Sequence, residues 1–200
     1  EIKKTLRSRG NWSGEVESSR VNGERYEIEL NIDAVHDDDG RISHFVGVFS
    51  DITSRKSTEK ELLKLANSDP LTELPNRSFF QASHSNLVRR ATPHALLCLD
   101  MDNFKKINDS LGHQTGDILI KQIAKRIQRM TDSNSTCYRL GGDEFSILME
   151  DFSDIHTITH FAQSILNTLS RPFIINKQEF VLGASIGIAL FPEDGSSPQE

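Results

Sequence analysis

The chain has 200 residues, a length that suits one large domain or two small ones. Of its residues 36% are hydrophobic, which is enough for a folded core, and 26% are charged, which is ordinary for a soluble protein. Its 29 acidic and 23 basic residues give a net charge of -6, which argues against a general nucleic-acid-binding protein. A nucleotide enzyme stays compatible with this balance, because metal ions can bring positive charge to a phosphate.

No apolar run is long enough to span a bilayer, and the chain does not open with a basic stretch followed by an apolar signal segment. We therefore expect a cytoplasmic segment without membrane contact, and a membrane anchor elsewhere in a longer parent is compatible with this. Cys98 and Cys137 lie in apolar stretches, so we expect both to be buried, reduced thiols.

Alternating apolar and polar residues predict three antiparallel strands near the start, at Val16–Val21, Tyr26–Val35 and Ile42–Phe49. Asn22-Gly23, between the first two strands, is a two-residue hairpin signal. Three strands of this size rarely form an independent core, so we expect the N-terminal half of this domain to lie outside the sequence.

Residues 54–67 contain no Gly or Pro and are rich in Lys, Glu and Leu, which predicts a helix joining two domains. Leu62, Leu65 and Ala66 give this helix an apolar side, and we hypothesise that it pairs with its twin in a dimer. A simple spacer is the alternative. Ser68-Asp69-Pro70 ends the helix, because the residue before a proline is disfavoured in the helical region.

The remaining residues, 68–200, mix helices and strands with a hairpin in the middle, so the predicted fold class is α+β. The predicted helices are Arg77–Arg90 with Asn76 as its cap, one that opens at Gly116-Asp117, and Ile155–Leu169. The predicted strands are His94–Asp100, Cys137–Leu140, Phe145–Met149 and Phe180–Leu190.

Acidic residues stand at two strand ends. Asp100, in Asp100-Met101-Asp102, ends an apolar strand, where a rigidly held carboxylate suits a hard cation such as magnesium. Gly141-Gly142 predicts a tight hairpin that lets a nucleotide approach the backbone, with Asp143 and Glu144 directly beside it. Taken separately, a turn or helix cap after the strand and a hairpin with solvated acids explain these two features better than a functional site does.

A polar loop is predicted from Phe104 to Asp109, and its backbone amides and Lys105 suit phosphate oxygens. Asn108 and Asp117 carry the acceptors and donors that match a purine edge. An ordinary polar loop followed by a helix capped at Asp117 is the alternative.

Together these segments closely resemble the GGDEF diguanylate cyclase family, in the family's order and spacing, over residues 68–200. The matching strings are Asp69-Pro70-Leu71-Thr72-Glu73-Leu74-Pro75-Asn76-Arg77, Leu99-Asp100-Met101-Asp102-Asn103-Phe104-Lys105-Lys106-Ile107-Asn108-Asp109, Gly112-His113-Gln114-Thr115-Gly116-Asp117, Arg139-Leu140-Gly141-Gly142-Asp143-Glu144-Phe145 and Ala184-Ser185-Ile186-Gly187-Ile188-Ala189. The resemblance implies a cyclase/polymerase-palm fold, with a central sheet flanked by helices.

The resemblance also implies a role for each site residue. Two Mg²⁺ or Mn²⁺ ions per active site would be held by Asp100, the Met101 carbonyl and Asp143. Phe104 and Lys105 would hold the β- and γ-phosphates, with Gly142 also at the substrate. The guanine would be read by Asn108 and Asp117, with His113 nearby. Asp143 would act as general base, and Glu144 would support the metal site.

The implied reaction joins two GTP molecules into cyclic di-GMP and two pyrophosphates, in a homodimer whose sites face each other. A catalytically weak, GTP-binding regulatory domain of a PAS-GGDEF-EAL phosphodiesterase is the alternative, with an EAL domain downstream. A cyclase of altered product choice, governed by Asn108 and Asp117, is a second alternative.

The sequence departs from the family at two places. Many members carry an inhibitory Arg-x-x-Asp product site, where this chain has Asp132-Ser133-Asn134-Ser135, so we expect no feedback inhibition there. Members also continue into a further helix and strand, so we expect the C-terminal end of this domain to lie beyond Glu200.

The first 53 residues resemble the last three strands of a PAS sensor domain, whose ligand stays unknown. The matching strings are Trp12-Ser13-Gly14-Glu15, Asn22-Gly23-Glu24, Asp39-Gly40-Arg41-Ile42 and Val46-Gly47-Val48-Phe49-Ser50-Asp51-Ile52-Thr53. Residues 1–53, 54–67 and 68–200 are therefore expected to be the PAS part, the linker and the cyclase domain. Trp12 suits either a ligand pocket or a core or interface position.

Overall fold

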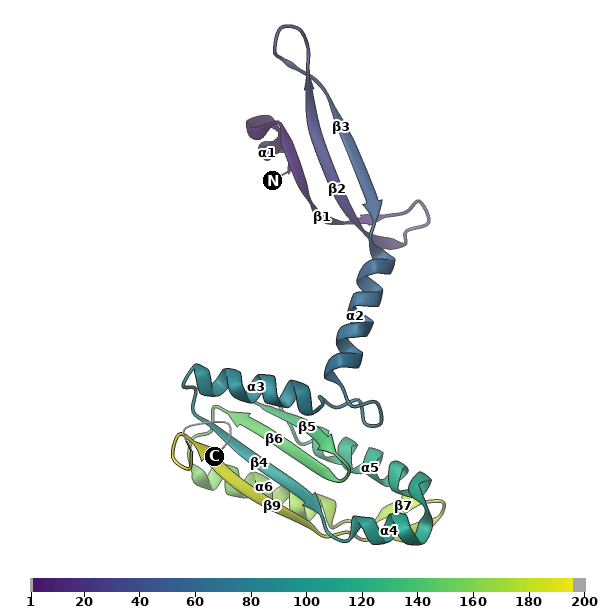
Figure 1. The fold of residues 1–200 in the computed structure, drawn as a ribbon, viewed down its shortest axis with the longest axis vertical. Coiled ribbons are helices and arrows are strands. Elements are labelled where there is room, and N and C mark those ends of the chain that lie inside the picture. The colour runs from purple at the N-terminus through teal and green to yellow at the C-terminus, as the bar shows by residue number, and fades with distance from the viewer. Residues whose placement is uncertain (1, 196–200) are drawn as a thin grey trace. The chain divides into compact units, whose positions relative to one another are not determined.

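The computed structural model describes residues 2–195 and divides into two units, Glu1–Leu63 and Lys64–Glu200 (Figure 1). In the first unit α1 (Ile2–Arg9) precedes an antiparallel sheet of order β1-β2-β3. Its strands are β1 (Asn11–Ser19), β2 (Arg25–His36) and β3 (Ile42–Asp51), followed by α2 (Thr53–Asn67). The three predicted strands are confirmed, although β1 starts before the predicted Val16 and ends at Ser19 rather than Val21. The loop that contains Asn22-Gly23 therefore runs from residue 20 to residue 24, longer than the expected two-residue turn.

One face of this first sheet is apolar, because apolar residues occupy alternate positions and successive side chains of a strand point to opposite faces. The register aligns Gly14 with Leu30 and Leu30 with Phe49, so these residues share that face. The indole of Trp12 lies over Gly14, where an added Cβ would be 2.8 Å from the ring. A larger residue at position 14 would therefore force the indole of Trp12 to move.

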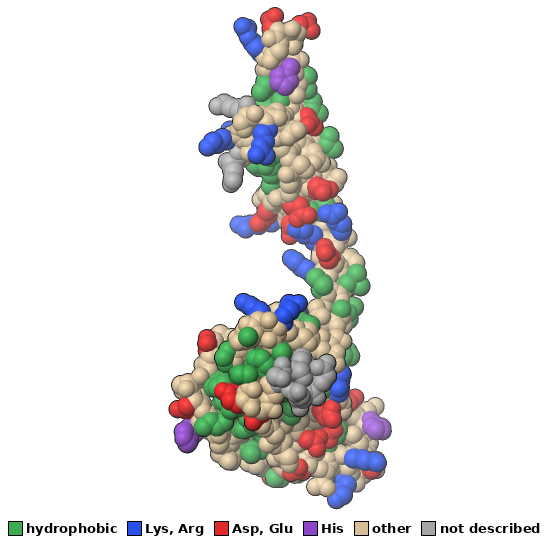
Figure 2. Space-filling view, turned by 60° about the vertical axis from the view of Figure 1, so that its left-hand side comes forward, with side chains coloured by type: hydrophobic (Ala, Val, Ile, Leu, Met, Phe, Trp, Pro, Cys, Tyr) green, Lys and Arg blue, Asp and Glu red, His purple; other side chains and the backbone are tan. Residues whose placement is uncertain are grey.

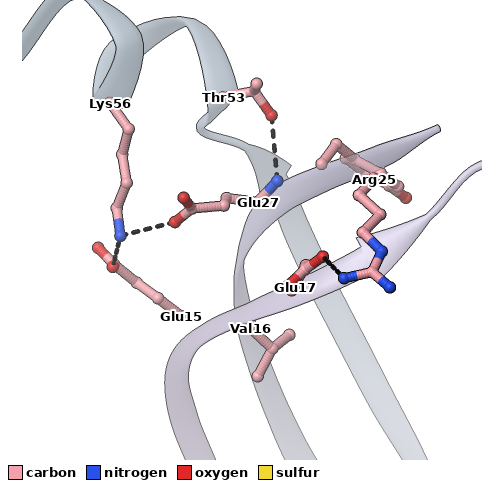
Figure 3. A pocket seen from close by; sticks show the side chains of 8 residues that line it. Glu15, Val16, Glu17, Arg25, Glu27, Thr53 and Lys56 are labelled. Carbon is pink, nitrogen blue, oxygen red and sulfur yellow. Dashed lines mark hydrogen bonds and ion pairs between the residues drawn. The ribbon is translucent and has the colours of Figure 1, made fainter. Parts of the chain in front are cut away.

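The start of α2 is tied to this sheet by ion pairs, shown in Figure 3. The Lys56 ammonium contacts the Glu15 carboxylate and lies 2.7 Å from that of Glu27. The register also sets Glu15 opposite Glu29 and Glu17 opposite Glu27, and like charges in these positions destabilise a sheet. Hydrogen bonds to Glu15 and Glu27 raise the pKa of Lys56. Lys56 thus offsets a repulsion built into the strand pairing.

Helix α2 confirms the predicted linker helix, and none of its residues is buried. Leu62, Leu63 and Leu65 are 61%, 56% and 67% exposed, and Figure 2 shows hydrophobic side chains emerging from this helix. Pairing of this helix with a second copy stays a prediction. In residues 2–195 no helix is long and apolar enough to cross a membrane.

The second unit is built on an antiparallel sheet of order β5-β6-β4-β9 (Figure 1). The strands are β4 (His94–Met101), β5 (Ser135–Gly141), β6 (Glu144–Glu150) and β9 (Ala184–Phe191). The other elements are α3 (Arg77–Arg89), α4 (Phe104–Leu111), α5 (His113–Gln128), α6 (Ile155–Leu169) and the hairpin of β7 (Phe173–Ile175) and β8 (Gln178–Phe180). The α+β class is confirmed.

Two apolar clusters hold this unit together, one on each face of the sheet. The larger contains Leu97 and Ile147 with residues of α5 and α6, and Leu87 of α3 packs on Tyr138 and Leu148 across the sheet. Alternation along β4 assigns each side chain to one of these faces. The helices thus fix the strands whose ends carry the candidate site.

One of the two cysteines departs from the expected burial. Cys137 is buried, and burial raises the pKa of its thiol to about 12. Cys98 is exposed, so the expectation for it was wrong. It lies on the face opposite Leu97 and Leu99. Its neighbours across the strands are Ser146 of β6 and Gly187 of β9, and the glycine offers no side chain to cover it.

Three boundaries also differ from the prediction. The predicted loop after Phe104 is helix α4, because Asn103 adopts a left-handed φ of 59° that turns the chain directly from strand to helix. Gly112, with φ 82°, separates α4 from α5, which therefore begins at His113 rather than at Gly116-Asp117. Phe180 belongs to the small β7-β8 hairpin, and pairing with β4 starts only at Ala184.

Candidate active site

Strand pairing brings the two predicted acidic positions to the same end of the central sheet. Leu99 pairs with Phe145, so Asp100, the next residue of β4, lies at the sheet end where β6 begins with Glu144. On its other side Asp100 pairs with Ser185 of β9. The Asp100 side chain is exposed there, held by a strand with a neighbour on each side.

The turn between β5 and β6 is Gly141–Glu144, in which Gly141 pairs with Glu144. Gly141 and Gly142 have φ of 142° and 54°, which favour glycine, although an added Cβ would meet no atom within 4 Å at either position. Backbone conformation, rather than space, therefore requires the two glycines. Asp143 is half-buried and Glu144 is exposed.

A β-bulge precedes this turn, because Arg139 pairs with Phe145 while Gly141 pairs with Glu144. Leu140 is the extra residue, and its carbonyl accepts a hydrogen bond of 2.9 Å from Arg77 Nε. Arg77 Nη2 lies 3.1 Å from the Glu144 carboxylate. Glu144, expected to support the metal site, is thus paired with an arginine in this structure.

A second arginine, Arg139 of β5, also contacts the Gly141–Glu144 turn. Arg139 donates to the Gly142 carbonyl at 2.8 and 3.2 Å, and its Nη1 lies 2.8 Å from Asp69 Oδ1. The Arg139 and Asp69 side chains are only 10% and 15% exposed. Burial raises the pKa of Asp69, but hydrogen bonds from Thr72 and Arg139 outweigh it and hold that pKa below its usual range. Sequence reasoning missed this pair, whose only signal was one acid and one base in two distant motifs.

Asp102, which sequence reasoning did not single out, links the ends of β4 and β9. Its N–H donates to the Gly183 carbonyl at 3.0 Å, and its Oδ1 accepts from Ser185 Oγ at 3.1 Å. A Cβ at Gly183 would lie 2.4 Å from Asp102 Oδ2. The link fixes the chain just before α4.

The first turn of α4 carries the two residues predicted to hold phosphates. Phe104 is buried at 7% exposure and anchors the helix, and Lys105 is exposed beside it. The first N–H groups of a helix have no partner four residues back and suit anionic oxygens, although in α4 the Lys106 N–H donates to the Asn103 carbonyl at 3.0 Å.

The residues predicted to read guanine lie on the two helices that pack together here, Asn108 on α4 and Asp117 on α5. A Cβ at Gly116 would lie 1.8 Å from Asn108 Oδ1, so the Asn108 amide lies against residue 116, next to exposed Asp117. Asn108 Oδ1 is buried and has no hydrogen-bond partner among the residues that the structure describes. An unpaired buried acceptor costs about 1–3 kcal/mol, which a ligand N–H would relieve. His113, the first residue of α5, is exposed.

Comparison with known proteins decides the family. Residues 66–200 match the family described as "Diguanylate cyclase, GGDEF domain", and residues 1–54 match a PAS domain. The chain belongs to the GGDEF family. The GGDEF domain of TpbB (YfiN) from Pseudomonas aeruginosa is 36% identical with a TM-score of 0.63, over 66% of this chain and 80% of that one.

Two longer proteins are also similar to this chain. The bifunctional diguanylate cyclase/cyclic di-GMP phosphodiesterase MucR of Pseudomonas aeruginosa is 38% identical over 74% of this chain and 22% of its own length. The cyclic di-GMP phosphodiesterase PdeR of Escherichia coli is 35% identical over 87% of this chain and 29% of its own length. The chain spans less than a third of either relative.

The donor set of this GGDEF domain fits a hard divalent cation. Asp100, the Met101 backbone and Asp143 offer only oxygen ligands at one end of the sheet, which suits Mg²⁺ or Mn²⁺. Within residues 2–195, no group of three or more His, Cys, Asp or Glu side chains is placed to hold a metal. Mg²⁺ is commonly held by one or two carboxylates together with substrate phosphates, and Asp100 and Asp143 supply two carboxylates.

The segment at the family's inhibitory position folds onto itself. Asp132 Oδ1 accepts from the Asn134 N–H and from Ser135 Oγ, both at 2.9 Å. Hydrogen bonds from Ser135 and Asn134 lower the pKa of Asp132. The absence of product inhibition through Asp132–Ser135 stays a prediction.

Proposed function

We propose that this GGDEF domain condenses two GTP molecules into cyclic di-GMP and two pyrophosphates. The observation that carries the proposal is the strand pairing that brings Asp100 to the sheet end where the Gly141–Glu144 turn presents Asp143. Helix α4 starts three residues after β4, so its phosphate-binding turn lies beside the same sheet end.

In this proposal Asn108 and Asp117 bind the guanine edge, and Lys105 with the first amides of α4 binds the β- and γ-phosphates. Asp143 accepts the proton of the ribose 3′-hydroxyl. The 3′-oxygen then forms a bond to the α-phosphorus of the other GTP, and the bond to the β-phosphate oxygen breaks to release pyrophosphate. Positioning and electrostatics supply most of the acceleration.

Asp100, the Met101 carbonyl and Asp143 would hold two Mg²⁺ or Mn²⁺ ions per site, which when bound supply positive charge to the phosphates. Each domain holds one GTP, so two copies of the chain must face each other for both bonds to form. We accordingly propose a homodimer as the active species.

We assign residues 1–53 to the PAS part, 54–67 to the linker and 68–200 to the cyclase domain. The exposed leucines of α2 support a role in pairing two linkers and placing the cyclase domains. Replacing Leu62 by Glu should weaken dimerisation, measured by analytical ultracentrifugation. An unchanged dimer would support the simple spacer.

The test is product formation by the full-length protein with GTP and Mg²⁺, read by chromatography and mass. Asp143→Ala should abolish cyclic di-GMP, whereas Glu150→Ala, at the end of β6 away from the Gly141–Glu144 turn, should not. Asn108→Ala and Asp117→Ala should reduce the preference for GTP over ATP. No product from the wild type would refute the proposal.

A regulatory GTP-binding domain is the second candidate, favoured by the match to the phosphodiesterase PdeR over 87% of this chain. An EAL domain downstream would then be the catalytic partner. Tight GTP binding with no product, and phosphodiesterase activity that responds to GTP, would establish this alternative.

A further inference from the structure

We propose that Arg77 and Arg139 are positioning residues that brace the Gly141–Glu144 turn and tie it to the last turn of α2. This inference rests on the proposed function for its catalytic consequence. The turn is contacted from two directions, by Arg77 from the start of α3 and by Arg139 from β5.

The two arginines satisfy backbone groups that the sheet leaves unpaired. The bulge removes Leu140 from the regular ladder, and Arg77 Nε donates to its carbonyl at 2.9 Å. Arg139 Nη2 donates to the Gly142 carbonyl at 2.8 Å. Asp143 lies between Gly142 and Glu144, and both of these residues contact an arginine. Its backbone position is therefore set by contacts on each side.

Each arginine is in turn linked to the end of α2. Asn76, directly before Arg77, donates from Nδ2 to the Ala66 carbonyl at 2.8 Å and from its backbone N–H to that of Asn67 at 2.9 Å. Asn76 Oδ1 also caps α3 by accepting from the Phe79 N–H at 3.0 Å. One side chain thus joins the end of one helix to the start of the next.

The second route starts two residues after α2, at Asp69. Its carboxylate accepts from the Thr72 N–H and hydroxyl at 2.8 and 2.7 Å and pairs with Arg139 at 2.8 Å. The Arg139 N–H also donates to the Pro75 carbonyl at 2.9 Å. A displacement of the last turn of α2 would therefore reach the Gly142 carbonyl through a buried pair and a short loop.

The test uses Arg77→Gln in the full-length protein, because Arg77 is exposed and its loss leaves no buried charge unpaired. Arg89→Gln, at the other end of α3, is the matched control. We expect Arg77→Gln to lower kcat by about tenfold or more with KM within about threefold, because small misplacements near a reacting group strongly reduce rate. Arg77→Lys should recover part of the loss, and the control should keep wild-type values.

Hydrogen exchange supplies a readout that needs no activity. The amides of residues 141–144 should exchange roughly tenfold faster in Arg77→Gln and in Arg139→Lys, with the other strands unchanged. Unchanged exchange at the turn, or an unchanged kcat in an active protein, overturns the inference. If the wild type makes no cyclic di-GMP, the proposed function fails, and hydrogen exchange alone then tests whether the two arginines hold the Gly141–Glu144 turn in place.

Discussion

Replacing Gly116 by Ala would test whether the Asn108 amide is part of the nucleotide site. An added Cβ would lie 1.8 Å from Asn108 Oδ1 and 3.3 Å from Phe104 Cζ, and such contacts are essentially never below 3.0 Å. The amide must therefore retreat by at least 1.2 Å, or α4 must move away from α5.

Two opposing effects set the stability of this variant. Alanine is favoured over glycine in a helix interior by about 1 kcal/mol. Overpacking of a close contact costs about 1–3 kcal/mol. We expect a net loss of roughly 0–2 kcal/mol in the free energy of unfolding, which leaves the domain folded. In an Asn108→Ala background the clash with the amide disappears and only the 3.3 Å contact with Phe104 Cζ remains, so Gly116→Ala should be less destabilising there, or stabilise by up to about 1 kcal/mol.

The effect on GTP should be larger than the effect on folding. Leaving a buried polar group without its hydrogen bond costs about 1–3 kcal/mol, so we expect GTP affinity to fall roughly 10–100-fold by calorimetry. Gly187→Ala is the control, because a Cβ there meets no atom within 4 Å. Wild-type GTP affinity in Gly116→Ala, or additive stability effects of the Asn108 and Gly116 substitutions, would refute this reasoning.

Three further predictions follow from burial and charge. Iodoacetamide should label Cys98 and not Cys137 in the native protein, and mass spectrometry showing the reverse would contradict the assigned faces of β4. Burial, together with repulsion from a neighbouring histidine, lowers the pKa of His84, so the unfolded chain binds its proton more readily. Stability should thus fall as pH drops below about 6.5, and His84→Phe should flatten this slope in denaturant titrations; an equal slope would argue against it. Lys56→Met should lower Tm more than Lys60→Met, because Lys56 pairs with Glu15 and Glu27. If this difference in Tm stays the same in 1 M salt, which screens exposed ion pairs, the ion pairs are not its cause.

Local chemistry made much of this fold predictable. The helix Ile155–Leu169 has the predicted bounds, because its apolar face repeats with helical spacing and Asp154 caps it by accepting from the Thr157 N–H. Asn76 caps α3 as predicted. The β5-β6 turn was evident from Gly141-Gly142, which few other residues can replace.

Contacts between distant residues explain what the sequence left undetermined. Asp69 and Arg139 are 70 residues apart, and no local pattern indicates that they pair. Helix α4 is a short element set by a left-handed Asn103, a conformation that residue type alone does not dictate. The exposure of Cys98 depends on which neighbouring side chains cover one face of β4, and the periodicity of the strand does not predict these neighbours. The roles of the site residues themselves stay predictions.

The tryptophan that lies over Gly14 gives this chain a built-in spectroscopic label. It is the only tryptophan in the sequence, and it belongs to the unit of residues 1–63. Its emission should report the unfolding of that unit, while far-ultraviolet circular dichroism reports both. Comparing the two melting curves would show whether the PAS strands and the GGDEF domain unfold together or in separate steps.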